Sequence, residues 1–133
     1  MSRVRFWLCA LLLVTGCASE KCKSCIAHGS PRMVHVVVCW LKTPGDENAR
    51  QKLIDASHDF VGRIPGLIRV DAGRVLASTR PSVDSSYDVT IVMTFVDEAA
   101  LISYGKSPEH QQAVRDVLRP LVDHYVVYDF TDK

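Results

Sequence analysis

One apolar run decides the fold: Met33-Val34-His35-Val36-Val37-Val38-Cys39-Trp40-Leu41. Its β-branched and apolar side chains are typical of a strand that is covered on both faces. A lone imidazole in such a strand must be paired or functional, because burying an unpaired polar group costs free energy. Strand alternation gives two faces, one with His35, Val37, Cys39 and Leu41 and the other with Val34, Val36, Val38 and Trp40.

The residues after this run predict a helix that is closed by a sharp turn. Thr43-Pro44-Gly45-Asp46 breaks the strand and starts the helix. The helix ends at Ile64-Pro65-Gly66, because proline cannot continue it and glycine permits a tight turn. One buried stripe of the helix is expected from apolar residues at steps of three and four, namely Ala49, Leu53, Ala56, Phe60 and Ile64.

The second half of the chain predicts two more strands, a helical region and a last strand. Strands are expected over about 67–75, 87–95 and 125–130. Asp97 is placed to cap a short helix, and Ser107 with Pro108 starts another one that Pro120 ends. The resulting order, β-α-β-β-α-β, predicts an α+β fold: a ferredoxin-like sheet with helices on one face.

The apolar character of both sheet faces predicts a homodimer. Helices cover only one face, so the other would leave a large apolar patch in a monomer. Closing two sheets face to face into an α/β barrel buries that patch. The residues expected on the uncovered face are Val37, Leu41, Ile91, Met93 and Phe95.

The start of the chain predicts export and lipidation. Arg3 and Arg5 precede an apolar stretch, 6–14, that is shorter than the roughly 20 residues needed to span a bilayer. Val14-Thr15-Gly16-Cys17 follows and resembles the lipobox of bacterial lipoproteins, in which the cysteine is lipidated and becomes the mature N-terminus. We therefore predict a lipoprotein signal peptide over 1–16, a lipid anchor on Cys17 and a tether over 17–32. An ordinary signal peptide with a free thiol at Cys17 is the alternative.

Lipidation would place the protein in the bacterial cell envelope, on the periplasmic side. Ala18 stands where inner-membrane lipoproteins often carry Asp, which favours the outer membrane. The formal net charge is +1 and no basic face stands out, so nucleic acid is not an expected partner. Cys22 and Cys25 predict a local disulfide or two idle thiols, with a redox pair as the alternative. Cys39 is expected to be a small buried hydrophobe.

The order of these pieces resembles the stress-responsive A/B barrel (Dabb) family of the dimeric α/β-barrel superfamily. The resemblance covers about 33–130, essentially the whole mature domain. It implies the ferredoxin-like fold and the dimeric barrel described above. The matching pieces are Val34-His35-Val36-Val37 with Trp40-Leu41-Lys42, Ile64-Pro65-Gly66-Leu67 with Gly73, Ser86-Tyr87-Asp88 to Phe95, Leu101 to Tyr104, Pro108-Glu109-His110 and Tyr128-Asp129-Phe130.

The resemblance also implies a candidate site. Most members of the family have no established activity, but related plant polyketide cyclases close a ring by aldol condensation without a cofactor. Their pocket holds a strand-one histidine, a tyrosine and a second histidine, which fall here on His35, Tyr104 and His110. Two further polar pocket positions fall on Val89 and Ser57, so this chain departs from the cyclase pattern there.

The same three residues make chemical sense by themselves. His110 shares a helix face with Val114 and Val117 and lies near a helix N-terminus, whose dipole favours a neutral imidazole that can act as a base. Tyr104 could donate a hydrogen bond to an oxygen that gains negative charge. Structural roles are the alternatives: His35 bonded to a backbone carbonyl or to Asp88, Tyr104 in the core and His110 in helix capping and packing.

Two functions remain open from sequence. The favoured one is a lipid-tethered, non-catalytic dimeric barrel that binds a small apolar or aromatic molecule or acts in envelope stress. The other is a cofactor-independent cyclase, lyase or isomerase that uses His110, Tyr104 and His35. No cofactor is expected, and a metal site built from His35, His110 and Glu109 is the disfavoured alternative. The predicted ligand-binding residues are Val37, Cys39, Leu41, Val89, Ile91, Met93 and Phe95.

Overall fold

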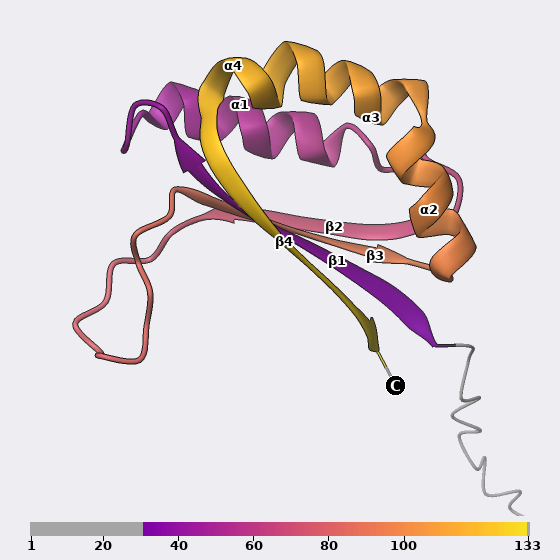
Figure 1. Ribbon diagram of the computed structural model, residues 1–133, viewed down its shortest axis with the longest axis horizontal. Coiled ribbons are helices and arrows are strands. Elements are labelled where there is room, and N and C mark those ends of the chain that lie inside the picture. The colour runs from indigo at the N-terminus through magenta and orange to yellow at the C-terminus, as the bar shows by residue number, and fades with distance from the viewer. Residues whose placement is uncertain (1–30, 133) are drawn as a thin grey trace, which may run out of the picture.

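A four-stranded antiparallel sheet forms the body of the computed structural model, which describes residues 31–132 (Figure 1). The predictions for the signal peptide, Cys17, the tether up to residue 30 and the Cys22–Cys25 pair lie outside the described residues. Among the residues that are described, no helix is both long and apolar enough to cross a bilayer.

The sheet has the order β2-β3-β1-β4, with every neighbouring pair antiparallel. The apolar run at 33–41 is therefore a central strand, paired with β3 on one edge and with β4 on the other. The C-terminal strand returns beside it, so that Asp132 pairs with Arg32 and the end of β4 lies beside the start of β1 (Figure 1). The strands are β1 (Arg32–Leu41), β2 (Leu67–Arg74), β3 (Val89–Phe95) and β4 (Val122–Asp132).

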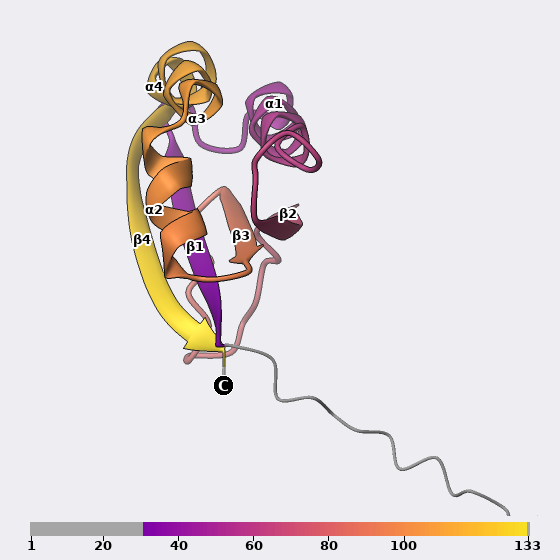
Figure 2. The same ribbon diagram turned by 90° about the vertical axis from the view of Figure 1, so that its right-hand side faces the viewer.

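The helices lie against one face of this sheet, which confirms the ferredoxin-like prediction. The helical elements are α1 (Glu47–His58), α2 (Glu98–Lys106), α3 (Pro108–Ala113), the π-helical turn η1 (Val114–Leu118) and α4 (Arg119–Leu121). A view turned by 90° shows α1 and α3 side by side across the sheet (Figure 2). The Asp97 carboxylate accepts from the amide of Ala100, and the Ser107 hydroxyl accepts from the amide of His110, so both predicted caps are confirmed.

The first helix is shorter than its apolar stripe predicted. It ends at His58 rather than Ile64, and the chain then turns through Gly62, whose φ is +78°. Phe60 and Ile64 nevertheless remain buried at 6% and 4% exposure, because the turns carry them back into the core. The stripe therefore predicted the buried positions but not the end of the helix.

Pro120 does not end the helical segment as predicted. The chain stays helical to Leu121, and β4 begins at Val122, three residues before the predicted start at Tyr125. Proline has no amide hydrogen to donate to the preceding turn. The chain accommodates it with the wider turn η1, in which the Arg119 amide reaches back five residues to the Val114 carbonyl.

The sheet faces are the reverse of the expectation. Val37, Leu41, Ile91, Met93 and Phe95 were expected on the uncovered face, but each is at most 8% exposed and packs under the helices. Alternation shows which residues share a face, not which face the helices cover. The outer face instead pairs apolar residues of β1 and β4, namely Val34 with Phe130, Val36 with Tyr128 and Val38 with Val126.

A buried carboxylate fixes the connection between β1 and α1. Asp88 is 3% exposed and accepts hydrogen bonds from the backbone amides of Leu41 and Gly45, each at 2.9 Å. Its Oδ1 also accepts from the Arg50 guanidinium at 2.7 Å. Asp88 is thus fully occupied as a structural anchor, and it is not the partner of His35.

Candidate functional site

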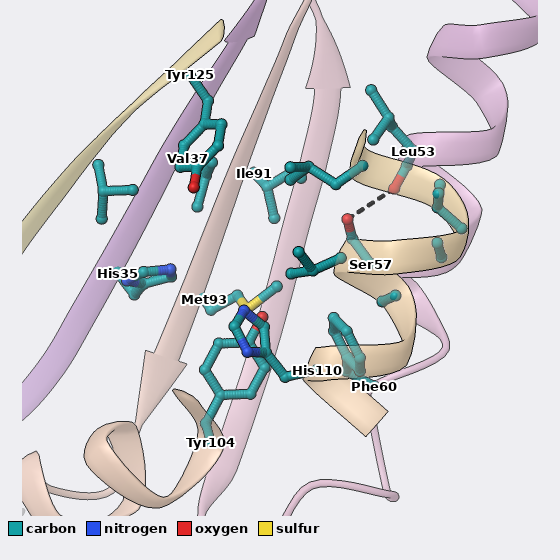
Figure 3. Close-up of a pocket in the computed structure, with 16 residues that line it drawn as sticks. His35, Val37, Leu53, Ser57, Phe60, Ile91, Met93, Tyr104, His110 and Tyr125 are labelled. Carbon is teal, nitrogen blue, oxygen red and sulfur yellow. Dashed lines mark hydrogen bonds between the residues drawn. The ribbon is translucent and has the colours of Figure 1, made fainter. Parts of the chain in front are cut away.

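A cavity of about 300 Å³ lies between the sheet and the helices (Figure 3). We call it the inner cavity. His35, Tyr104 and His110 lie at one end of it, and the rest of its wall is almost entirely apolar. The β-strands contribute Val37, Ile91, Met93, Tyr125 and Val127, and the helices and the turns between them contribute Leu53, Ala56, Ser57, Phe60, Ala113, Val114, Val117 and Leu118.

His35 is held by a carboxylate on the neighbouring strand. Asp129 is its direct partner in the β1–β4 register, and His35 Nδ1 lies 2.7 Å from Asp129 Oδ1. The His35 side chain is 15% exposed, whereas that of Asp129 is 48% exposed. A carboxylate that accepts from Nδ1–H fixes the orientation of the imidazole and leaves Nε2 for other contacts.

Tyr104 is the aromatic centre of the site. It is 5% exposed and packs against both histidines, with ring centroids 5.9 Å from His35 and 4.5 Å from His110. Phe60 and Phe95 enclose its other sides. Burial raises the pKa of Tyr104 well above its usual value, so the phenol is a proton donor across the physiological range. Figure 3 shows its hydroxyl directed into the cavity beside His110.

His110 completes the group from the start of α3. Its amide is capped by Ser107, and its Nδ1 lies 3.2 Å from the carbonyl oxygen of Gly105. Burial lowers the pKa of His110 and the nearby His35 lowers it further, while the bond to Gly105 acts in the opposite direction. The direction agrees with the neutral imidazole expected from sequence, and burial of the ring is its main cause.

The predicted ligand-binding residues divide into two groups. Val37, Ile91 and Met93 line the inner cavity. The other four do not, and for them the prediction needs correction: Cys39, Leu41, Val89 and Phe95 are at most 3% exposed and fill the core. They share the inner face of the sheet but lie where side chains pack directly on one another.

The position of Ser57 also limits its chemistry. Its side chain lines the inner cavity, but its hydroxyl donates to the Leu53 carbonyl at 2.7 Å, as the dashed line in Figure 3 shows. The hydroxyl therefore serves the helix. Val89 lies in the core and contributes no polar group. Most of the polar atoms at the cavity thus belong to His35, Tyr104 and His110.

The sequence did not predict the role of Asp129, nor that β4 forms part of the cavity wall. Asp129 can be recognised as the partner of His35 only when the pairing of β1 with β4 is known. That pairing depends on where β4 begins and in which register it runs. Tyr125 and Val127 line the cavity for the same reason, since they pair with Cys39 and Val37 on the inner face. The alternation of β4 was the available signal, and the misplaced start of the strand concealed the register.

The disfavoured metal site has no support in this geometry. Glu109 does not line the inner cavity beside the two histidines. Among residues 31–132, no three His, Cys, Asp or Glu side chains are grouped closely enough to hold a metal ion. The arrangement of the described residues is instead that of an apolar cavity closed by two imidazoles and a phenol.

Comparison with known proteins identifies the family. Residues 33–132 match the family model Dabb, the stress responsive A/B barrel domain. This chain belongs to the Dabb family. A comparison with curated proteins found no match for it.

Solved structures resemble this Dabb domain at low sequence identity. A Dabb family protein with a ferredoxin-like fold from Mesorhizobium loti is 24% identical with a TM-score of 0.63, over 78% of this chain and 99% of that one. A dimeric ferredoxin-like protein of unknown function from Thermobifida fusca is 18% identical with a TM-score of 0.62, over 79% and 93%. The hydroxynitrile lyase of Passiflora edulis is 15% identical with a TM-score of 0.66, over 77% and 94%. These likenesses support the fold.

Proposed function

We propose that this Dabb protein binds a small apolar or aromatic molecule in the inner cavity, as a lipid-anchored homodimer of the bacterial envelope. The cavity itself is the observation that carries the proposal. Its volume of about 300 Å³ is at the lower end of the range for small-molecule sites, roughly 300–1,000 Å³, which suits a molecule of one or two rings. Its apolar wall favours such a ligand, and its few polar groups converge at one end.

Ligand-dependent stabilisation tests this binding. Propylbenzene is a suitable probe, because a ligand that binds only the folded chain raises the free energy of unfolding by about 2.7 kcal/mol at 100 times its dissociation constant. Val114→Phe fills the cavity from η1 and should abolish the effect. Val61→Phe makes the same change at a position that is 52% exposed and should preserve it. Equal stabilisation of both variants would contradict the proposal.

A second candidate function is acid–base catalysis without a cofactor. The His35–Asp129 contact favours it, because a carboxylate that orients a histidine is a recurrent part of catalytic sites. In this scheme neutral His110 would remove a proton from a carbon beside a carbonyl group. Tyr104 would donate a hydrogen bond to the enolate oxygen, and His35 would orient the substrate.

Exchange of carbon-bound hydrogen tests the catalytic role without a known substrate. Acetophenone carries exchangeable hydrogens on the methyl carbon beside its carbonyl group. In deuterated water their removal replaces them with deuterium, and the proton nuclear magnetic resonance signal of the methyl group is lost. The enzyme candidate predicts exchange above background in the wild type and its loss when His35 and His110 are both replaced by Ala. Exchange that is identical in the two proteins would exclude the acid–base role and leave ligand binding.

The outer face of the sheet supports the homodimer. Tyr128 and Phe130 on β4 are 58% and 51% exposed, and their β1 partners are also apolar. A patch of this kind is typical of an interface. Native mass spectrometry should report a dimer for the wild type, a monomer for Tyr128→Asp and a dimer for the control Val61→Asp. A monomeric wild type would refute the barrel.

The lipid anchor is supported by the sequence Val14-Thr15-Gly16-Cys17 after a basic and apolar start. Two or more acyl chains would hold the protein firmly at a membrane. Cells fed an alkyne-tagged fatty acid should label the wild type and the control Cys22→Ser, but not Cys17→Ser. Labelling of Cys17→Ser would place the modification elsewhere.

A further inference from the structure

A second cavity lies on the other side of the histidine–tyrosine group. It has a volume of about 380 Å³ and shares His35, Tyr104 and His110 with the inner cavity, so these three residues form a partition between the two spaces. We call it the outer cavity. Its remaining wall consists of Met33, Glu98, Leu101, Ile102, Gly105 and Asp129.

The outer cavity differs from the inner one in exposure and in charge. Ile102 is 52% exposed and the Asp129 side chain 48% exposed, so this space meets solvent. Asp129 and Glu98 bring two carboxylates to it, and no lysine or arginine is among the described residues that line it. Within the described part of the chain, the Glu98 side chain has no hydrogen-bond or ion-pair partner. This wall can therefore accept hydrogen bonds from a bound molecule.

The partition offers one further polar group to a ligand. The Tyr104 residue is 5% exposed, and its hydroxyl has no hydrogen-bond partner among the described residues. Among the described residues every fully buried polar side-chain atom has a partner, so the unpartnered Tyr104 hydroxyl is itself open to the cavity space. Because Tyr104 lines both cavities, a molecule that extends from one to the other can accept a hydrogen bond from this hydroxyl.

We infer that the ligand spans both cavities. Its apolar ring or short chain occupies the inner cavity, and a hydroxyl or amine group at its other end reaches past Tyr104 to Asp129 and Glu98. This inference rests on the proposed function of the inner cavity and adds the class of ligand: an aryl or alkyl alcohol or amine. Carboxylic acids of the same shape are disfavoured, because their anion would face two carboxylates without a cation to balance it.

Three probes with one skeleton test the inference on the full chain. They are 3-phenylpropylamine, 3-phenylpropan-1-ol and 3-phenylpropanoate, with dissociation constants measured by isothermal titration calorimetry at neutral pH. The amine should bind about tenfold or more tightly than the carboxylate, since charge-assisted hydrogen bonds are the stronger class. The alcohol should lie between them.

Variants assign the difference to the outer cavity. Glu98→Gln should weaken binding of the amine about three- to tenfold and change binding of the alcohol little, because only the charge is removed. Glu109→Gln is the matched control: it removes the same charge from the neighbouring helix, at a residue that does not line the outer cavity. It should leave all three affinities unchanged.

The outcomes separate this inference from the function on which it rests. If the three probes and propylbenzene bind with equal affinity, the inner cavity binds ligands but the outer cavity does not select them, and the inference is overturned. A preference for the amine that Glu98→Gln and Glu109→Gln reduce equally would also overturn it. If neither propylbenzene nor any of the three probes binds, the proposed function fails as well.

Discussion

His35 and Asp129 face each other across β1 and β4, with 2.7 Å between Nδ1 and Oδ1. Because a carboxylate only accepts, this contact requires a hydrogen on Nδ1 of His35. We predict that neutral His35 is the Nδ1–H tautomer and that Asp129→Ala releases this preference. Long-range proton–nitrogen spectra of the imidazoles measure it. Asp123→Ala is the control, since it should affect only His124, whose Nδ1 lies 2.9 Å from Asp123. An unchanged His35 tautomer in Asp129→Ala would contradict the assignment.

The pKa of His110 should be measurably low. Burial, with a further contribution from His35, holds it below the usual value of about 6.5. The unfolded chain then takes up this proton at a higher pH than the folded chain, so stability should fall as the pH drops from about 6.5 through the folded pKa. Titration by nuclear magnetic resonance gives the midpoint, and His110→Gln should lack this loss of stability. A midpoint at or above 6.5 would show that burial does not dominate.

Asp88 should be the most costly charge to remove. Burial opposes its ionisation, but the amides of Leu41 and Gly45 and the Arg50 guanidinium outweigh that effect and hold the pKa of Asp88 below its usual value. Asp88→Asn should lower the free energy of unfolding by about 3 kcal/mol, as expected when one partner of a buried ion pair is lost. Urea denaturation measures it. Asp71→Asn, in the exposed pair with Arg69, should cost less than about 1 kcal/mol.

The same carboxylate predicts a dependence on pH. Its folded pKa lies below the unfolded value of about 3.9, so its contribution is complete above that value and is lost as the pH falls through the folded pKa. Asp88→Asn should therefore lose less stability than the wild type between neutral pH and pH values below about 3.9. Parallel curves for the two proteins would contradict this origin.

Gly66 should tolerate no side chain. Its φ is +78°, and an added Cβ would lie 2.5 Å from the Cβ of Ala100 on α2. Gly66→Ala therefore combines the left-handed penalty, about 1–2 kcal/mol, with a steric conflict of about 1–3 kcal/mol. Gly45→Ala is the control for the first cost alone, because Gly45 has φ +79° and nothing within 4 Å. Equal losses in urea denaturation would show that α2 moves aside freely.

Local chemistry explains why much of the fold was predictable. The β-branched run, the Asp97 cap and the Ser107–Pro108 start each act within a few residues, and all appear in the structure as expected. The end of α1 and the start of β4 were missed, because they depend on tertiary packing and on how the chain accommodates Pro120.

The candidate site was predictable only in part for the same reason. His35, Tyr104 and His110 come together as expected, because each lies on the inward face of its own element. Asp129 required the register of β4, which no local pattern supplies. The choice between cavity wall and core was also unpredictable: Met93 and Phe95 share a strand face, yet only Met93 borders empty space.

The π-helical turn sets the rotation of His110. The turn between Val114 and Leu118 accommodates one residue more than an α-helical turn. In an α-helix each residue turns the chain by about 100°. Deleting one residue there, with the end of the segment fixed by β4, would swing the start of α3 about a quarter of a turn around its axis. His110 would then leave the partition while Val122 kept its place. Insertions and deletions in this short stretch are thus a route by which related chains can exchange one cavity-facing residue for another without altering the sheet.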